Sequence, residues 1–160
     1  MTLEKERKML KRILTVLMGC AISLGAVAAE EWTKADAVKM VEKATAFYKA
    51  NGREKLLAEL NTKNGQFHKG TLYVVAIDMN HTMLAHPINP KLVGKNTLNV
   101  PDVDGKYFRR ENIAVAKGPG SGWVDYKYTN PETGKAEAKT GYVVKIDDDL
   151  ILTCGVYRHQ

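Results

Sequence analysis

The chain has 160 residues, which suits a single domain preceded by a targeting segment. Hydrophobic residues make up 44% and charged residues 26%, which are ordinary values for a globular protein. The net charge is +6, yet residues 1–29 alone carry five Lys or Arg against two Glu, and the later cations are scattered among acids. This distribution argues against a nucleic-acid-binding surface, which needs a concentrated basic stripe.

The first thirty residues have the three-part pattern of a secretory signal peptide. Residues 4–12 are rich in basic charge, residues 13–28 are apolar and uncharged, and small residues surround Ala28 and Ala29. The apolar stretch is shorter than the ~20 residues that a membrane-spanning helix needs. We therefore predict a signal peptide over residues 1–29, cleaved near Ala28 or Ala29.

The mature domain is then expected to comprise residues 30–160 and to be periplasmic or secreted. Two alternatives stay open for the leader. An uncleaved anchor would hold the domain on the membrane facing the periplasm, and Cys20 would be the site of lipidation in a lipoprotein. The second cysteine, Cys154, lies in an apolar run and is expected to be a buried structural residue.

Two helices are predicted at the start of this domain. Thr33 followed by Asp36 is typical of a helix N-terminus, and apolar residues then recur at helical spacing up to Tyr48. Gly52 ends this long helix, and a second short helix is expected over 53–60. Residues 61–70 are polar and read as a loop.

The rest of the domain favours strands. Residues 71–78 are β-rich and apolar on both faces, which predicts a central strand, and residues 82–86 complete a hairpin. A long irregular stretch and a short helix over 107–117 follow. Three further strands are expected over 123–128, 139–146 and 150–157. On the first of these, Val124, Tyr126 and Tyr128 share one face. Tight turns imply antiparallel pairing, so we predict an α+β domain with a five-stranded antiparallel sheet.

Signatures of catalysis or metal binding are weak in this sequence. The glycine-rich run over 118–122 lacks the Lys-Ser/Thr ending of a phosphate-binding loop. The segment from Asp102 begins like a calcium loop, but Ile113 occupies the position of the closing carboxylate. The four histidines have no ligand spacing, and no nucleophile motif appears. We expect no catalytic residue, no metal site and no cofactor. Among the histidines, we expect His81 to be solvated in a turn and regard His86 as a ligand candidate.

A set of aromatic and cationic residues in the second half of the domain suits a small organic acid. Tyrosine and tryptophan offer an apolar wall with one donor at the tip, and arginine grips a carboxylate with two parallel hydrogen bonds. The set consists of Arg109, Arg110, Trp123, Tyr126, Tyr128, Lys139 and Tyr142. The alternative is that the aromatics fill the core and the cations are solvated.

Several motifs in order resemble the single Cache domain of bacterial extracytoplasmic sensors, from about Ala35 to Tyr157. The segments that carry the resemblance are 72–80, 84–87, 89–96, 101–106, 122–126, 139–143 and 155–157. The resemblance implies a PAS-like antiparallel sheet behind a long N-terminal helix, with a pocket for short carboxylates. It also implies a ligand-binding set of His86, Arg110, Trp123, Tyr126, Lys139 and Tyr142.

Strand geometry sets a condition on that set. In a regular strand, Lys139 and Tyr142 point to opposite faces, as do Trp123 and Tyr126. Without a bulge, or a pocket at a strand end, only one residue of each pair can touch the ligand.

Two functions of different kinds follow. The first is an extracytoplasmic module that binds a short organic acid and acts in signal transduction through a partner. The second is an accessory protein that docks on a membrane sensor or transporter without a ligand of its own. The chain departs from typical family members in lacking their transmembrane helices and output modules, so direct signalling is not expected. A homodimer along the long helix is compatible with the pattern, and an enzyme is not expected.

Overall fold

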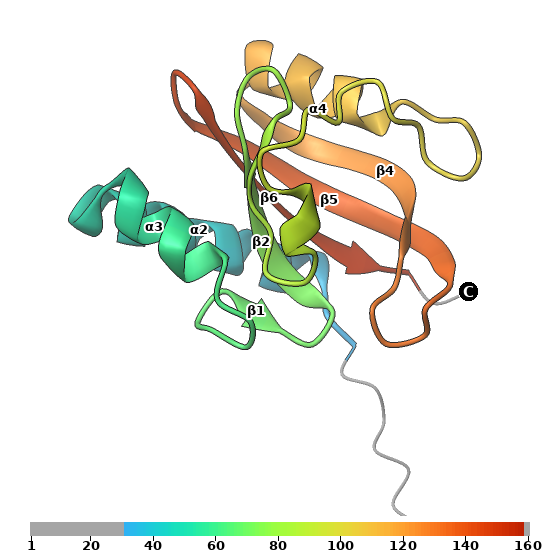
Figure 1. Ribbon diagram of the computed structural model, residues 1–160, viewed down its shortest axis with the longest axis horizontal. Coiled ribbons are helices and arrows are strands. Elements are labelled where there is room, and N and C mark those ends of the chain that lie inside the picture. The colour runs from blue at the N-terminus through green and yellow to red at the C-terminus, as the bar shows by residue number, and fades with distance from the viewer. Residues whose placement is uncertain (1–30, 159–160) are drawn as a thin grey trace, which may run out of the picture.

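The computed structural model describes residues 31–158, and the predicted signal peptide, its cleavage site and Cys20 lie outside these residues. The domain is α+β, with an antiparallel sheet between two layers of helices and loops (Figure 1). Among the described residues, no helix combines the length and the hydropathy needed to cross a membrane.

The first layer consists of α2 (Lys34–Asn51) and α3 (Arg53–Leu60). Thr33 and Asp36 form a capping box: Thr33 Oγ1 accepts from the Asp36 amide at 3.2 Å, and Asp36 Oδ2 accepts from the Thr33 amide at 3.0 Å. Gly52, with φ of +83°, ends α2 in a conformation that favours glycine. The sequence-predicted helix boundaries are therefore confirmed at both ends of α2.

The sheet contains six strands, one more than predicted, in the order β1-β2-β6-β5-β4 with β3 also paired to β2. These strands are β1 (His68–Lys69), β2 (Leu72–Ile77), β3 (Met83–Ala85), β4 (Ser121–Thr129), β5 (Ala136–Asp147) and β6 (Leu150–Tyr157). The additional strand, β1, is a two-residue pairing within the predicted loop, where His68 lies opposite Tyr73. The α+β fold with antiparallel pairing is otherwise as predicted. Strand β2 is an inner strand, paired on both edges and buried on both faces as predicted, although the middle of the strand order is β6.

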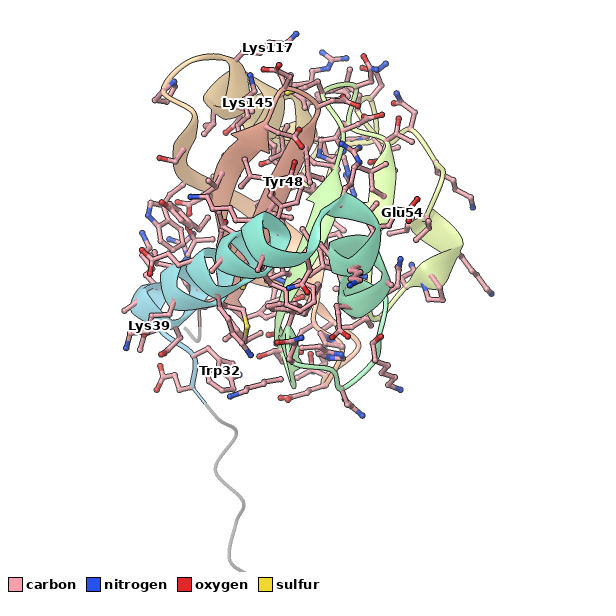
Figure 2. All side chains as sticks on the ribbon, turned by 90° about the vertical axis from the view of Figure 1, so that its left-hand side faces the viewer. Trp32, Lys39, Tyr48, Glu54, Lys117 and Lys145 are labelled. Atoms are coloured by element: carbon pink, nitrogen blue, oxygen red, sulfur yellow. The ribbon has the colours of Figure 1, made fainter. Side chains whose placement is uncertain are left out.

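Two apolar clusters lie on opposite faces of the sheet. Helices α2 and α3 cover one face through side chains that include Leu56, Leu60 and Val41, packed on Val74 and Leu152. Figure 2 looks onto this helical layer, with Lys39 and Tyr48 marking the course of α2 across the sheet. Cys154 is buried within the same cluster, as predicted for a structural cysteine.

The opposite face is covered by α4 (Phe108–Lys117) and by the segment that crosses from β3 to α4, including the 3-10 turn Pro90–Leu92. Phe108, Ile113 and Ala116 of α4 pack against Val124 and Val143 of the sheet. This layer is less continuous than the helical one, and the space between it and the sheet holds the candidate site.

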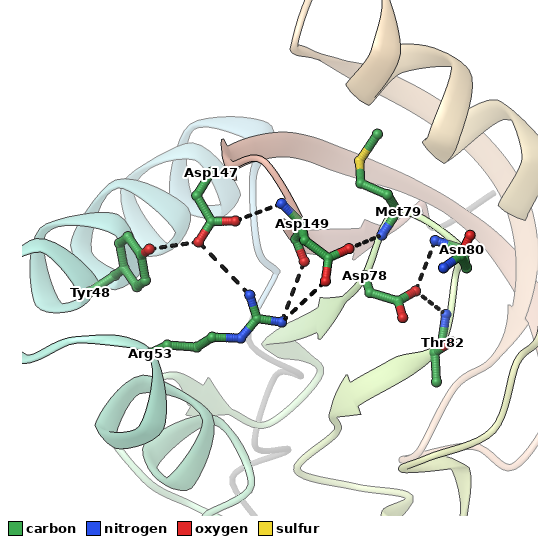
Figure 3. A network of polar contacts seen from close by, with 8 residues as sticks. All are labelled: Tyr48, Arg53, Asp78, Met79, Asn80, Thr82, Asp147 and Asp149. Atoms are coloured by element: carbon green, nitrogen blue, oxygen red, sulfur yellow. Dashed lines mark hydrogen bonds and ion pairs between the residues drawn. The ribbon is translucent and has the colours of Figure 1, made fainter.

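A polar network ties the two layers together at the β5–β6 turn (Figure 3). The Tyr48 hydroxyl of α2 donates to Asp147 Oδ2 at 2.6 Å, and Arg53 of α3 lies 3.9 Å from the same carboxylate and 3.8 Å from Asp149. Asp149 Oδ1 in turn accepts from the amide of Met79 at 3.2 Å. The β5–β6 turn therefore links the turn after β2 to the two N-terminal helices.

Candidate ligand-binding site

A cavity of about 50 Å³ lies between the sheet and α4. Aromatic side chains form much of its wall, namely Tyr73, Phe108, Tyr126 and Tyr128, together with the aliphatic residues Val75, Ile77 and Met83. Its polar lining consists of His81, His86, Arg109, Asn112, Lys139 and Thr153. Among the described residues that line the cavity, none is acidic, so its charged groups are all cations.

Lys139 is the most deeply buried cation of the domain's described part, with only 2% of its surface exposed. Its ammonium donates a hydrogen bond to the Tyr73 hydroxyl at 3.0 Å and lies over the Tyr73 ring at 4.1 Å and the Tyr157 ring at 4.3 Å. Among residues 31–158 it forms no ion pair. Because burial disfavours the charged form, the pKa of Lys139 is lowered to about 7.

His86 is held in one tautomer by the backbone that follows it. Its Nδ1 accepts hydrogen bonds from the amides of Ile88 at 3.2 Å and Asn89 at 3.0 Å. A ring nitrogen that accepts cannot carry the proton, so the proton of neutral His86 is on Nε2. Burial, and next the neighbouring charge of Lys139, lower the pKa of His86 to about 4. At neutral pH, His86 is therefore an uncharged donor.

Arg109 brings a second cation to the cavity from the first turn of α4. Its guanidinium donates to the Val100 carbonyl at 2.7 Å and lies 4.3 Å from the centre of the Phe108 ring. The residue is only 8% exposed, and burial lowers the pKa of Arg109. Like Lys139, it forms no ion pair within the described part of the chain. Two desolvated cations that form no ion pair are costly unless an anion approaches them.

A model of the single Cache domain 2 family matches residues 26–159 of the sequence. The chain belongs to this family. The family is an extracytoplasmic module that senses ligands in signal transduction, which agrees with the resemblance predicted from the sequence motifs.

Relatives of this Cache domain occur in larger receptors. The methyl-accepting chemotaxis protein McpP of Pseudomonas putida is 33% identical over 66 residues, 41% of this chain and 12% of McpP. The sensor histidine kinase MctS of Rhizobium johnstonii is 34% identical over 86 residues, 53% of this chain and 18% of MctS. The matches therefore span less than a fifth of either relative.

A solved structure confirms the fold. It is described as "Structural basis for carboxylic acid recognition by a Cache chemosensory domain" and superposes with a TM-score of 0.62. It shares 23% sequence identity with this Cache domain, and the match covers 98% of this chain and 97% of the other.

Three of the six predicted ligand-binding residues line the cavity: His86, Tyr126 and Lys139. Tyr126 stacks on Phe108 of α4 with 4.1 Å between ring centres and 4° between planes. Val124, Tyr126 and Tyr128 share the cavity-side face of β4, as predicted, since the two tyrosines line the cavity and Val124 belongs to the cluster beneath α4.

Trp123 and Tyr142, two further members of the predicted set, lie on the opposite face of the sheet. They pack against each other with 5.0 Å between ring centres, beneath α2, where the Lys34 ammonium lies 4.7 Å from the Trp123 ring. The condition set by strand parity is therefore met without a bulge, because β4 and β5 pair in continuous register over this region. Only one residue of each predicted pair reaches the cavity.

Arg110, the sixth member of the predicted set, does not line the cavity. Arg110 is exposed, donates two hydrogen bonds to Asn99 Oδ1 at 3.2 and 2.9 Å, and lies over the Tyr107 ring. Successive helical residues are about 100° apart, so only one of two adjacent arginines can face the sheet. The signal that identifies Arg109 is its spacing to Asn112, Ile113 and Ala116, which share the buried face of α4.

The expectation that His81 is solvated is also wrong. Asp78 Oδ1 accepts from the amides of Asn80 and Thr82 at 2.9 and 2.7 Å, and the tight turn places His81 at φ of +59°. The crossing segment then covers the ring, which is 3% exposed and lies 2.9 Å from Thr97 Oγ1. Sequence reasoning also missed Tyr73 and Asn112, of which Tyr73 was detectable from its alternation with Val75 and Ile77 on β2.

Proposed function

We propose that this Cache domain binds a short organic acid outside the cytoplasm and signals through a membrane partner. The observation that carries the proposal is the pair of buried cations, Lys139 and Arg109, that line one cavity in which no described lining residue is acidic and neither cation forms an ion pair within the described chain. A carboxylate would supply the missing counter-charge, since charge-assisted hydrogen bonds to Lys and Arg are among the strongest in proteins.

The donors around the cavity support the same ligand class. Lys139 offers an ammonium and His86 offers its Nε2–H, both beside the Tyr73 ring, which lies 5.4 Å from the His86 ring. The aromatic and aliphatic walls would accommodate a short carbon chain. The solved Cache chemosensory domain that is described as recognising carboxylic acids is consistent with this assignment.

Cavity size limits the ligand to a few non-hydrogen atoms. A water molecule needs about 10–15 Å³ of comparable space. The cavity of about 50 Å³ is therefore several times larger than one water site. Two- and three-carbon monocarboxylates fit this size better than four-carbon dicarboxylates or aromatic acids.

Isothermal titration calorimetry of the purified protein tests the proposal, with acetate, propionate, pyruvate and lactate as ligands and succinate and benzoate as size controls. We expect saturable 1:1 binding of at least one short acid. Lys139→Met should weaken that binding by about 100-fold, since it removes a charge-assisted contact. Lys145→Met is the matched control, because Lys145 lies on the same strand but outside the cavity lining and pairs with Asp148 at 3.8 Å.

The absence of binding by every short acid would overturn the proposal and favour the second function, docking on a membrane sensor or transporter without a ligand. The homodimer along α2, the signal peptide over residues 1–29 and the lack of enzymatic activity stay predictions. N-terminal sequencing of the exported protein would test cleavage near Ala28 or Ala29.

A further inference from the structure

Asn112 brings an unused hydrogen-bond acceptor to the cavity. It lies three residues after Arg109 on α4, so both side chains emerge on the buried face of the helix. The residue is 6% exposed and lines the cavity, and its Oδ1 has no hydrogen-bond partner within the described chain. A buried acceptor without a partner is uncommon in folded proteins and calls for an explanation.

The orientation of this amide follows from a chain of hydrogen bonds that leads away from the cavity. The Thr97 hydroxyl donates to the His81 carbonyl at 3.3 Å, which leaves its lone pairs to accept the proton on His81 Nδ1 at 2.9 Å. His81 Nε2 is then an acceptor, and it receives the Asn112 Nδ2–H at 3.3 Å. The amide nitrogen of Asn112 is thereby engaged, and its oxygen is the atom left over.

This chain of hydrogen bonds requires neutral His81, since protonated imidazole has no acceptor. Burial, and next the nearby charge of Arg109, lower the pKa of His81 to about 4. The imidazole therefore stays neutral, and Asn112 Oδ1 stays an acceptor, over the whole neutral pH range.

The charge of the cavity decides which kind of donor can satisfy Asn112. An ammonium group, as in an amino acid, would enter beside Arg109 and Lys139 with no acidic lining residue in the described chain to balance it. A hydroxyl group donates one hydrogen bond and brings no charge. A keto group only accepts, and an alkyl group does neither, so both would leave Asn112 Oδ1 unpaired.

We propose that the pocket selects short hydroxy acids, with the ligand hydroxyl donating to Asn112 Oδ1 and the ligand carboxylate facing Lys139 and Arg109. This inference rests on the proposed function and narrows its ligand class. Thr97 and His81 then act as positioning residues, because they hold the Asn112 amide in the orientation that accepts.

Calorimetric affinities for lactate, propionate, pyruvate and alanine at pH 7 test the inference, with the wild-type protein and the Asn112→Leu variant compared. We expect wild type to bind lactate about tenfold more tightly than propionate. A hydrogen bond that satisfies one buried acceptor contributes about a factor of ten to the affinity. In Asn112→Leu the lactate-to-propionate affinity ratio should fall to about one, because neither ligand then meets an unpaired acceptor.

The wild-type ratio is decisive even if Asn112→Leu does not fold. Thr97→Val provides a milder test, because it removes the hydrogen bond to His81 Nδ1 and leaves the cavity lining unchanged. The lactate-to-propionate affinity ratio should then fall by several-fold. Propionate, pyruvate or alanine binding as tightly as lactate would overturn the hydroxy-acid inference and leave the proposed function intact. Failure of all short acids to bind would overturn both.

Discussion

The carbon stem of Lys139 on β5 crosses directly over Gly155 on β6. A Cβ atom at residue 155 would lie 2.6 Å from Lys139 Cε, closer than real side chains approach. Lys139 is opposite Tyr157 in the strand register, so its stem reaches diagonally along β6 before its ammonium meets Tyr73. The absence of a side chain at Gly155 is therefore what allows the ammonium to enter the cavity.

Gly155→Ala should displace the Lys139 ammonium without changing its charge. We expect short-acid affinity to fall by about tenfold, the loss of roughly one well-placed charged hydrogen bond. Titration calorimetry measures this effect. Gly122→Ala is the matched control on β4, since its Cβ would meet Val115 at 3.2 Å and Gly122 does not line the cavity. Wild-type affinity in Gly155→Ala would show that the position of the ammonium does not matter.

Lys139→Met should move binding and stability in opposite directions. The substitution removes a buried ammonium that no carboxylate of the described chain balances, and it keeps most of the apolar stem. We expect the free energy of unfolding without ligand to rise by about 1–3 kcal/mol while acid binding weakens by about 100-fold. Urea denaturation at pH 7 gives the first quantity and calorimetry the second. A variant destabilised by the change would indicate that Lys139 is mainly structural.

Above neutral pH, the ligand-free protein should become more stable. The pKa of Lys139 is about 7 in the folded protein against 10.5 for an ordinary lysine, so between these values the unfolded chain binds more protons. Stability then rises with pH, by at most about 1.36 kcal/mol per pH unit for one group. Denaturation from pH 7 to about 8 checks the slope, because above this range the unfolded chain also loses the proton of Cys154, whose pKa burial raises, and that loss opposes the effect. Lys139→Met should remove most of this pH dependence of stability. An unchanged slope in the variant would show that other groups cause the pH dependence.

Below neutral pH, His81 and His86 should destabilise the protein. Each has its pKa lowered from 6.5 to about 4 by burial, so the unfolded state binds more protons between these values and stability falls as the pH drops. The carboxylates with lowered pKa, such as Asp102, contribute mainly below about pH 5. Urea midpoints from pH 7 to about 5 therefore report mainly on the histidines, including His68, whose pKa burial also lowers. His86→Asn, whose amide oxygen can replace Nδ1, should reduce the slope by at most about half.

Arg109 and Arg110 form a natural matched pair for a binding test. Arg109→Gln removes a cation from the cavity lining and should weaken short-acid binding by at least about tenfold. Arg110→Gln affects an exposed side chain that contacts Asn99 and should leave binding within about twofold. Equal losses in the two variants would contradict the assignment of Arg109 to the site. Melting temperatures of both variants serve as the control for folding.

Much of the architecture was determined by local sequence pattern. The helix N-terminus at Thr33, the glycine that ends α2 and the strand over residues 150–157 were predicted where the structure places them. Alternation put Tyr126 and Tyr128 on one face of β4, and strand parity showed that Lys139 and Tyr142 cannot both reach the cavity. These features depend on near neighbours in the chain, whose spacing sets the backbone and its faces.

Only the tertiary structure decided which face holds the site and which groups meet there. Arg109 faces the cavity in place of Arg110 because α4 packs on the sheet with one particular face. The periodicity of the sequence indicates which face of the helix is buried, but it does not show that this face lines a ligand site. Asn112 is paired with His81, 31 residues away in sequence, because the crossing segment folds over the turn after β2. The lowered pKa of Lys139 arises from burial by strands and rings distant in the chain, an environment that exists only once the sheet and α4 have packed together.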